Sequence, residues 1–338
     1  MMHNPEPLVT VVLPFYNASK TLSGAVESIM NQNMDDFECI LVDNGSNDGS
    51  GSIAEERIAM DDRFRLASEP QHGVVPAFNR GAELSKGKYL ARMDADDEAL
   101  PDRLRLQSAF LEKHQQCDAV GGKAEYVSHI PLSEGFKRYV DWVNGIVTEQ
   151  QIKLKQFVGM PVVNPTMMWR KSSSERYGLY REGVFPEDYE MWLRWLSLGA
   201  GIAKVASPVI RWHDYENRLT RTHSVYSEDA FDHIKTKYLA EWLHKNNPFY
   251  PEVVVWGASR QSRKRVSLLD QYGIRIRNFI DIKPQRDISH PVIHYSQIQP
   301  PGDAFILIYV KLNAAKQLIE RYLMEKGYVE GNDFLFVS

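Results

Sequence analysis

Two aspartates separated by one residue, Asp94 and Asp96, follow a run of strand-forming residues at 88–93. Side chains two positions apart on an extended segment point to the same side, so both carboxylates should face one space. Carboxylate oxygens are the ligands that Mg²⁺ and Mn²⁺ prefer, and such a cation can hold a diphosphate. The spacing therefore predicts a metal-assisted phosphate site. The alternative is a solvated loop, because an Asp-x-Asp is common by chance.

Three further carboxylates stand at the ends of expected elements. Asp43 ends the strand-like run 37–42, where it could accept the imide N–H of a uracil or form an Asx turn. Glu187 and Asp188 open an expected helix directly after Pro186. The helix dipole stabilises acidic residues there, and one of them could also take a proton from an acceptor hydroxyl. Each position thus has a chemical and a structural interpretation.

The elements that would position these groups alternate along the chain. Strands are expected at 8–13, 37–42, 63–67 and 88–93, and helices at about 20–29, 53–60, 74–85, 104–114 and 187–198. This alternation predicts an α/β fold with a mainly parallel sheet and helices on both faces. Ligands bind such sheets at the carboxyl ends of the strands, which is where the acidic residues fall.

A second, smaller α/β unit is expected near the C-terminus. The pattern predicts a catalytic domain at 1–215, a helical linker at 216–248 and a small Rossmann-like domain at 249–338. Gly257 follows a strand as in a dinucleotide fold, but the second and third glycines are replaced by Ser259 and Ser262. A Cβ at the second position obstructs a pyrophosphate. An interaction or acceptor-guiding domain is therefore favoured over nucleotide binding.

Composition limits the partners. Lys and Arg number 40 against 44 Asp and Glu, a net charge of −4, so no general basic field is available for nucleic acid. Cys39 and Cys117 are the two cysteines, which excludes a disulfide framework and a cysteine-rich zinc site. There is no apolar run near the roughly 20 residues that span a bilayer, and no signal-peptide pattern. A cytoplasmic protein is expected.

Four blocks in this order resemble the inverting glycosyltransferases of family 2, which have the GT-A fold. They are Val11–Asn17, Asp43–Ser50, Gly73–Gly81 with its continuation Met93–Asp97, and Glu187–Arg194. Each block alone is weak, but the ordered set over residues 8–213 is specific. The resemblance implies transfer of a sugar from a nucleotide-sugar, with a UDP-sugar favoured, to a hydroxyl of a glycan or lipid-linked oligosaccharide in surface polysaccharide synthesis.

The resemblance also implies roles for individual residues. Donor binding would fall to Pro14, Tyr16, Asn17, Asp43, Asn79, Asp94 and Asp96. Mn²⁺ or Mg²⁺ would be held directly by Asp96, with Asp94 and His213 as further ligands. Asp188 would be the catalytic base, with Glu187 as its rival. On the acceptor or diphosphate side would lie Asn164, Arg211, Arg218 and Arg221, for which functional and structural interpretations both stay open.

One departure and two alternatives remain. The family usually has a second acidic residue after Asp43, and here it is Asn44, which weakens the inference of a uridine donor. A nucleotidyltransferase of related fold would need a Gly- and Arg/Lys-rich loop after the first strand, but residues 15–20 contain no glycine. A non-catalytic scaffold would have no reason to keep the four aspartates of these motifs together, which are Asp43, Asp94, Asp96 and Asp188.

Two further partners are considered. The first is the inner face of a membrane, which Phe231, Tyr238 and Trp242 on one helical face would contact unless they pack inside the protein. The second is another glycan-assembly enzyme, reached through the C-terminal domain.

Overall fold

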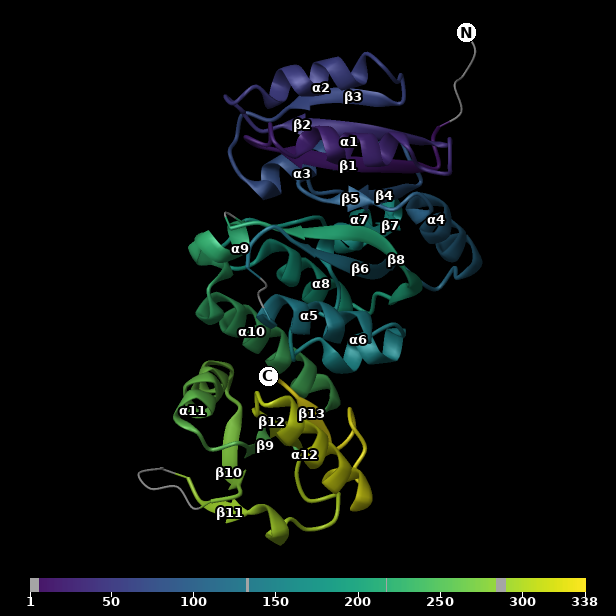
Figure 1. Ribbon diagram of the computed structural model, residues 1–338. Coiled ribbons are helices and arrows are strands. Elements are labelled where there is room, and N and C mark those ends of the chain that lie inside the picture. Colours follow the sequence, from purple (N-terminus) through teal and green to yellow (C-terminus); the bar gives the residue numbers. More distant parts are fainter. Residues whose placement is uncertain (1–5, 132–133, 217, 284–289) are drawn as a thin grey trace. The chain divides into compact units, whose positions relative to one another are not determined.

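The computed structural model describes residues 6–131, 134–216, 218–283 and 290–338 (Figure 1). The chain divides into two compact units. The first comprises Met1–Ile152 and Val162–Tyr226, and the second comprises Lys153–Pro161 and Ser227–Ser338.

The first unit contains an eight-stranded sheet in the order β3-β2-β1-β4-β7-β6-β8-β5. Its strands are β1 (Val9–Phe15), β2 (Phe37–Asp43), β3 (Phe64–Ser68), β4 (Tyr89–Arg92), β5 (Glu98–Ala99), β6 (Ala119–Ser128), β7 (Met168–Arg170) and β8 (Ile202–Asp214). The strands from β3 to β4 in this order run parallel, as the sequence predicts. The remainder is mixed, because β7 runs antiparallel to both neighbours and β5 runs antiparallel to β8.

Helices cover both faces of the parallel part. Up to Tyr226 the described helices are α1 (Leu22–Met30), α2 (Ser50–Ile58), α3 (Val74–Leu84), α4 (Arg103–Lys113), α5 (Glu134–Asn144), α6 (Glu149–Lys155), α7 (Lys171–Tyr177), α8 (Glu187–Ser197) and α9 (Leu219–Thr222), with the short 3₁₀ turns η1 (Asn164–Thr166) and η2 (Ser224–Tyr226). The last residues of α6 belong to the second unit. The buried side of α1 shares a core with Val11 and Leu13 of β1. A Cβ at Gly81 of α3 would lie 2.4 Å from Val12, on the opposite face of that strand.

The second unit has a five-stranded, all-parallel sheet in the order β11-β10-β9-β12-β13. Its elements are α10 (Glu228–Asn246), β9 (Glu252–Trp256), α11 (Arg260–Val266), η3 (Ser267–Tyr272), β10 (Arg275–Asp281), β11 (Val292–His294), η4 (Tyr295–Gln297), β12 (Ile306–Ile308), α12 (Asn313–Glu325) and β13 (Phe334–Phe336). Numbered within the unit, this is the 3-2-1-4-5 strand order of a Rossmann fold.

Helix α10 belongs to the second unit rather than standing between two units. Tyr238 is 4 % exposed, and the ring of Trp242 lies 5.6 Å from Phe305 and 6.4 Å from Phe157. Tyr238 and Trp242 of the predicted aromatic face therefore pack within the protein, while Phe231 is half-buried. Among the described helices, none is both long and apolar enough to cross a membrane.

Candidate active site

The parallel strands β1, β2 and β4 end side by side, so the loops that follow them share one edge of the sheet. Asn17 has a φ of +48°, and its Oδ1 accepts a hydrogen bond of 2.9 Å from the backbone N–H of Asn47. This contact ties the loop after β1 to the loop after β2. The neighbouring Tyr16 is 53 % exposed, and its ring meets the His72 ring edge-on at 5.4 Å, whereas Pro14 is half-buried.

Asp43 forms the Asx turn that its sequence favours. Its Oδ1 accepts from the Ser46 backbone N–H at 2.9 Å. Its Oδ2 has no hydrogen bond within the described part of the chain, so the turn leaves one carboxylate oxygen for a ligand. The two interpretations of Asp43 are therefore compatible.

Asn44, the departure from the family pattern, holds the loop that leads into α3. Its buried amide donates to the carbonyls of Glu69 (2.9 Å) and Gln71 (2.7 Å), and its Oδ1 accepts from the Gly73 backbone N–H at 2.8 Å. An aspartate cannot donate to two carbonyls. The substitution of the usual acid thus has a local structural reason that is independent of the nucleotide.

Three carboxylates gather beyond the end of β4. Ligand atoms of Asp94, Asp96 and Asp97 all lie within 4.8 Å of one another. Oδ1 of Asp97 accepts from the His213 backbone N–H at 2.9 Å, but its Oδ2 is buried and has no hydrogen-bond partner. Burial raises the pKa of both Asp96 and Asp97, and the charge of Asp96 raises that of Asp97 further.

This cluster fits a hard divalent cation. A buried carboxylate oxygen without a donor is costly, and a cation would relieve it together with the repulsion between neighbouring acids. The sequence prediction named Asp94 and Asp96 but not Asp97. The third carboxylate was visible in Asp94–Ala95–Asp96–Asp97, but its burial was not.

The ring of His213, predicted as a third metal ligand, lies outside the acidic cluster, and its buried Nε2 has no hydrogen-bond partner among the described residues. Its Nδ1 lies 2.7 Å from Nε2 of His129, and its Nε2 lies 3.7 Å from Oε1 of Glu98. It is not among the clustered ligand atoms of the described residues. The structure instead brings the His213 backbone to Asp97, so that this residue positions a carboxylate.

The three predicted arginines are placed differently. The guanidinium carbon of Arg218 lies 4.3 Å from the centre of the Trp212 ring. Burial raises the pKa of Asp96, and the positive charge of Arg218 opposes that rise. Arg211 pairs with Glu98 and Glu125 at 3.2 and 3.3 Å on an exposed surface. Arg221 pairs with the buried Asp214 at 2.6 Å. Of these arginines, Arg218 is the one whose charge acts on the acidic cluster.

The first turn of α8 carries the two candidate bases. Glu187 is buried, and its Oε2 accepts from the hydroxyl of Tyr226 at 2.8 Å. Asp188 is half-buried, and its Oδ1 accepts a hydrogen bond of 2.6 Å from the backbone N–H of Tyr189. Burial, followed by the charge of Glu187, raises the pKa of Asp188 to about 7, while Arg92 opposes this rise. A carboxylate that titrates near neutrality suits a general base.

The side chains of Asn164 and Asn79 form hydrogen bonds with α8 and with the loop that precedes it. Oδ1 of Asn164 accepts from the Tyr180 hydroxyl at 3.1 Å and from Nε1 of Trp192 at 3.2 Å. The side-chain amide of Asn79 donates to the Tyr180 carbonyl at 3.0 Å. Arg194 of α8 adds hydrogen bonds to the carbonyls of residues 177–179. These contacts fix the loop before α8, and with it the position of Asp188.

The dinucleotide-like loop of the second unit is occupied by internal contacts. Ser262 Oγ donates to the Tyr309 carbonyl at 2.9 Å, and a Cβ at Gly257 would lie 3.2 Å from that carbonyl oxygen. Oδ2 of Asp281, the expected ribose ligand, accepts from the Ala258 backbone N–H at 2.9 Å.

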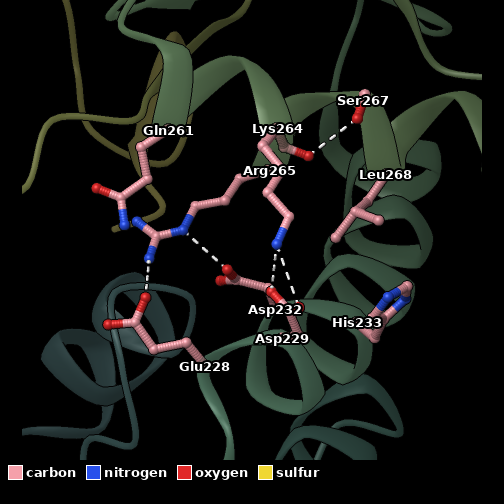
Figure 2. Close-up of a pocket in the computed structure, with 9 residues that line it drawn as sticks. All are labelled: Glu228, Asp229, Asp232, His233, Gln261, Lys264, Arg265, Ser267 and Leu268. Atoms are coloured by element: carbon pink, nitrogen blue, oxygen red, sulfur yellow. Dashed lines mark hydrogen bonds and ion pairs between the residues drawn. The ribbon is translucent and has the colours of Figure 1, made fainter.

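A polar pocket in this unit lies between α10 and α11 (Figure 2). Figure 2 shows Arg265 reaching both Asp232 (2.8 Å) and Glu228 (3.1 Å), and Lys264 reaching Asp229 (2.8 Å). Because these cations are neutralised by acids of the same pocket, it has little free charge to offer a phosphate.

The fold and the first unit's site define a nucleotide-sugar-dependent glycosyltransferase of GT-A fold. The chain belongs to glycosyl transferase family 2, whose model matches residues 10–178. It is 27% identical over 245 residues to an uncharacterized glycosyltransferase of Haemophilus influenzae, covering 71% of this chain and 75% of that one.

Two further relatives are informative. TuaG of Bacillus subtilis, whose name assigns it to teichuronic acid biosynthesis, is 34% identical over 111 residues, or 32% of this chain and 44% of that protein. The S. aureus TarS 1–349 structure, solved with UDP-GlcNAc, matches with a TM-score of 0.56 at 17% identity and covers 78% of this chain and 71% of that one. The latter likeness bears on the fold alone.

Proposed function

We propose that the protein transfers a sugar from a UDP-sugar, with inversion at the anomeric carbon, to a hydroxyl of a glycan or lipid-linked oligosaccharide in surface polysaccharide synthesis. The observation that carries the proposal is the presence in one unit of two distinct carboxylate groups. One is the cluster of Asp94, Asp96 and Asp97, of which Asp97 is buried and the other two half-buried, and which fits a metal. The other is Asp188, whose pKa lies near neutrality.

The loops after β1 and β2 would hold the nucleoside. Tyr16 presents an exposed ring and Pro14 a half-buried one, either of which can lie against a nucleobase. Oδ2 of Asp43 can accept the imide N–H of uracil, a donor that cytosine and adenine lack at the corresponding ring nitrogen. The crystal structure of TarS with UDP-GlcNAc supports testing uridine donors first.

The acidic cluster would hold Mn²⁺ or Mg²⁺, with Asp96 the direct ligand and Asp94 and Asp97 beside it. The cation would offset the charge that develops on the departing nucleoside diphosphate. Arg218 acts on the same side of the site, because its charge already acts on Asp96. Arg211 and Arg221 are engaged in ion pairs of their own, so we assign them no contact with the diphosphate.

Asp188 would take the proton of the acceptor hydroxyl. In an inverting transfer the hydroxyl attacks the anomeric carbon as the bond to the diphosphate breaks, and the proton passes to Asp188. A carboxylate held by α8, far along the chain from the metal cluster, can face the sugar from the other side. A positioned base typically contributes a factor of about 10² to 10⁴ to the rate.

A panel of nucleotide-sugars tests the donor class. Each is added with Mn²⁺, and thermal unfolding of the full chain is measured. A ligand present at 100 times its Kd adds about 2.7 kcal/mol of stability. We expect UDP-sugars to raise the unfolding temperature and GDP- or CMP-sugars to have no effect. Stabilisation by a nucleoside triphosphate with release of pyrophosphate would support the nucleotidyltransferase alternative instead.

For the acceptor, the proposal extends to lipid-linked glycans at the inner face of a membrane, with other glycan-assembly enzymes as partners of the second unit. Because Tyr238 and Trp242 are packed within the protein, they supply no surface for this contact. Co-flotation with anionic liposomes is expected only when they carry a lipid-linked acceptor. Flotation with bare liposomes would show a membrane surface elsewhere on the chain.

A further inference from the structure

Arg92, the last residue of β4, is held in a fixed orientation beside the acidic cluster of Asp94, Asp96 and Asp97. Its side chain is buried, and its Nε donates to Oδ1 of Asp94 at 2.9 Å. The guanidinium carbon lies 5.4 Å from the ring centre of Phe78 and 5.2 Å from that of Tyr180. Two aromatic rings and one carboxylate therefore fix the orientation of this cation.

The backbone of Arg92 is fixed as well. Its N–H donates to the carbonyl of Met167 at 3.0 Å, and its carbonyl accepts from the guanidinium of Arg103 at 2.6 Å. Arg103 is itself fully buried. The strand end that leads into Asp94 thus has little freedom to shift.

The charge of Arg92 reaches across the site. The positive charge of Arg92 favours the ionised form of Asp188, and the negative charges of Asp94 and Glu187 favour the charged form of Arg92. One cation therefore interacts with carboxylates of the acidic cluster and of α8. Its NH1 is buried and has no hydrogen-bond partner within the described structure. A buried donor without an acceptor costs stability, so packing alone gives no reason for an arginine here. An electrostatic role does.

Besides Arg92, the backbone N–H of Tyr189 favours the ionised form of Asp188, but it carries no full charge, and the other groups that act on Asp188 do not replace the cation. Glu187 and Asp94 are acids that disfavour its ionised form. Tyr139, Tyr180 and Tyr226 lie close enough for the charge of Asp188 to raise their pKa values, which burial has already raised. These phenols stay neutral at pH 7.

We propose that Arg92 is a positioning residue for the transfer reaction, which orients Asp94 on the metal side and supplies a fixed positive charge to the base side. The inference rests on the proposed function, because it requires Asp188 to act as a base. Arg92 itself would exchange no proton and would not need to touch the acceptor.

The pH dependence of kcat/KM at saturating Mn²⁺ separates this role from a merely structural one. Arg92→Gln removes the charge, so the acidic limb of the pH profile should move up by about one pH unit. Because the ionised fraction of Asp188 at pH 7 then falls from about one half to about one tenth, kcat at pH 7 should fall at least about fivefold. Arg92→Lys keeps the charge but loses the planar contact with Asp94. Its kcat should fall, while its limb stays within about 0.3 unit of the wild type.

Arg65→Gln is the matched control. Arg65 lies on the edge strand β3, pairs with Glu38 at 2.7 Å and is separated from β4, the strand of Arg92, by β2 and β1. Its substitution removes one arginine–carboxylate pair from the same sheet and should leave the limb and kcat unchanged. A limb that moves equally in both Gln variants would show a general charge effect and overturn the proposal.

The remaining outcomes are decisive. An unmoved limb in a folded Arg92→Gln variant overturns the inference, even when kcat falls. Should Arg92→Gln not fold, Arg92→Lys decides: a lower kcat with an unmoved limb supports the proposal, and an upward shift of about one unit refutes it. A wild-type chain that transfers no sugar from any nucleotide donor would instead refute the proposed function.

Discussion

The hydroxyl of Tyr226 donates a hydrogen bond of 2.8 Å to Oε2 of Glu187, which is 7 % exposed. The adjacent Asp188 is more open, and its Oδ1 is held by a backbone N–H of its own helix. Each carboxylate thus accepts one hydrogen bond through one oxygen, but Glu187 is buried inside the unit, whereas the more exposed Asp188 is better placed to meet a substrate hydroxyl. The two neighbours, between which the family resemblance favoured Asp188, have different surroundings.

From this difference we expect Asp188→Asn to lower kcat at least about a hundredfold with donor affinity nearly unchanged. Glu187→Gln, which can still accept from Tyr226, should lower kcat by no more than about tenfold. Steady-state kinetics and donor titration check both. The reverse ranking would move the base by one residue, and two active variants would refute the mechanism.

Asp188 should also make stability depend on pH. Its pKa is raised in the folded chain from 3.8 to about 7, so the folded state binds more protons than the unfolded state between these values. The free energy of unfolding therefore falls as pH rises from about 4 to about 7 and then levels off. Asp188→Asn should unfold at a temperature higher by about 5 °C at pH 8 and by about zero at pH 4. An equal gain at both pH values would contradict this origin.

The sequence predicted the part of the fold that comes first in the chain. Strands β1 and β2 are buried on both faces, so they appear as continuous apolar runs, and α1 buries Leu22, Ala25, Val26 and Ile29. Such patterns depend only on neighbouring residues. The α/β architecture of the GT-A fold is confirmed, while the roles of individual site residues remain predictions.

The middle of the chain could not be predicted in the same way. Strand β7 has three residues and β5 has two, too few for any periodicity. Strand β6 contains Gly121 and Gly122, where a Cβ would lie 2.8 Å from Met167 and 2.4 Å from Val209. These glycines are required by partners distant in sequence. The pairing of β7 between β4 and β6, which makes the sheet mixed, likewise depends on nonlocal contacts.

We expect Asp97 to be needed for metal binding, although the Asp-x-Asp spacing in the sequence predicted only Asp94 and Asp96 as ligands. Asp97→Asn keeps an acceptor for the His213 N–H but removes the charge of the unpaired Oδ2. We expect the Mn²⁺ concentration for half-maximal activity to rise at least about tenfold. Asp96→Ala and EDTA should each abolish turnover without unfolding the chain.

The matched control is Glu98→Gln. Glu98 is the next acid along the chain but pairs with Arg211 outside the cluster, so Mn²⁺ activation should change less than about twofold. Full activity of the wild type in EDTA would refute the metal requirement altogether.

The second unit should bind neither NAD nor NADP. Ser259 occupies the position where a close approach of backbone to pyrophosphate is needed, and Asp281 already accepts from Ala258 and Ile282. Titration calorimetry on the full chain should show no binding tighter than about 100 μM. Micromolar affinity would show that the internal contacts are displaced by a dinucleotide.

Lys204 of β8 should limit stability at neutral pH. It is 3 % exposed, and its Nζ donates to the Val143 carbonyl at 2.6 Å near the end of α5. Burial, with a smaller contribution from the charge of Lys123, lowers its pKa from 10.5 to about 7. The unfolded chain therefore binds more protons than the folded chain between pH 7 and 10.5, and stability rises with pH across this window. Below about pH 7 the full penalty of a buried charge remains.

Lys204→Met removes that penalty and loses one hydrogen bond worth about 1 kcal/mol. The net gain at pH 7 should be on the order of 3 kcal/mol, or roughly 5 to 10 °C in unfolding temperature. At pH 9.5 the lysine is already neutral in the folded chain, so the gain should fall to nearly zero. Lys123→Met, the matched control, should change the unfolding temperature by less than about 2 °C at either pH. Thermal unfolding of the three proteins at both pH values checks this, and a Lys204→Met variant that is less stable at pH 7 would show that the contact with Val143 outweighs the buried charge.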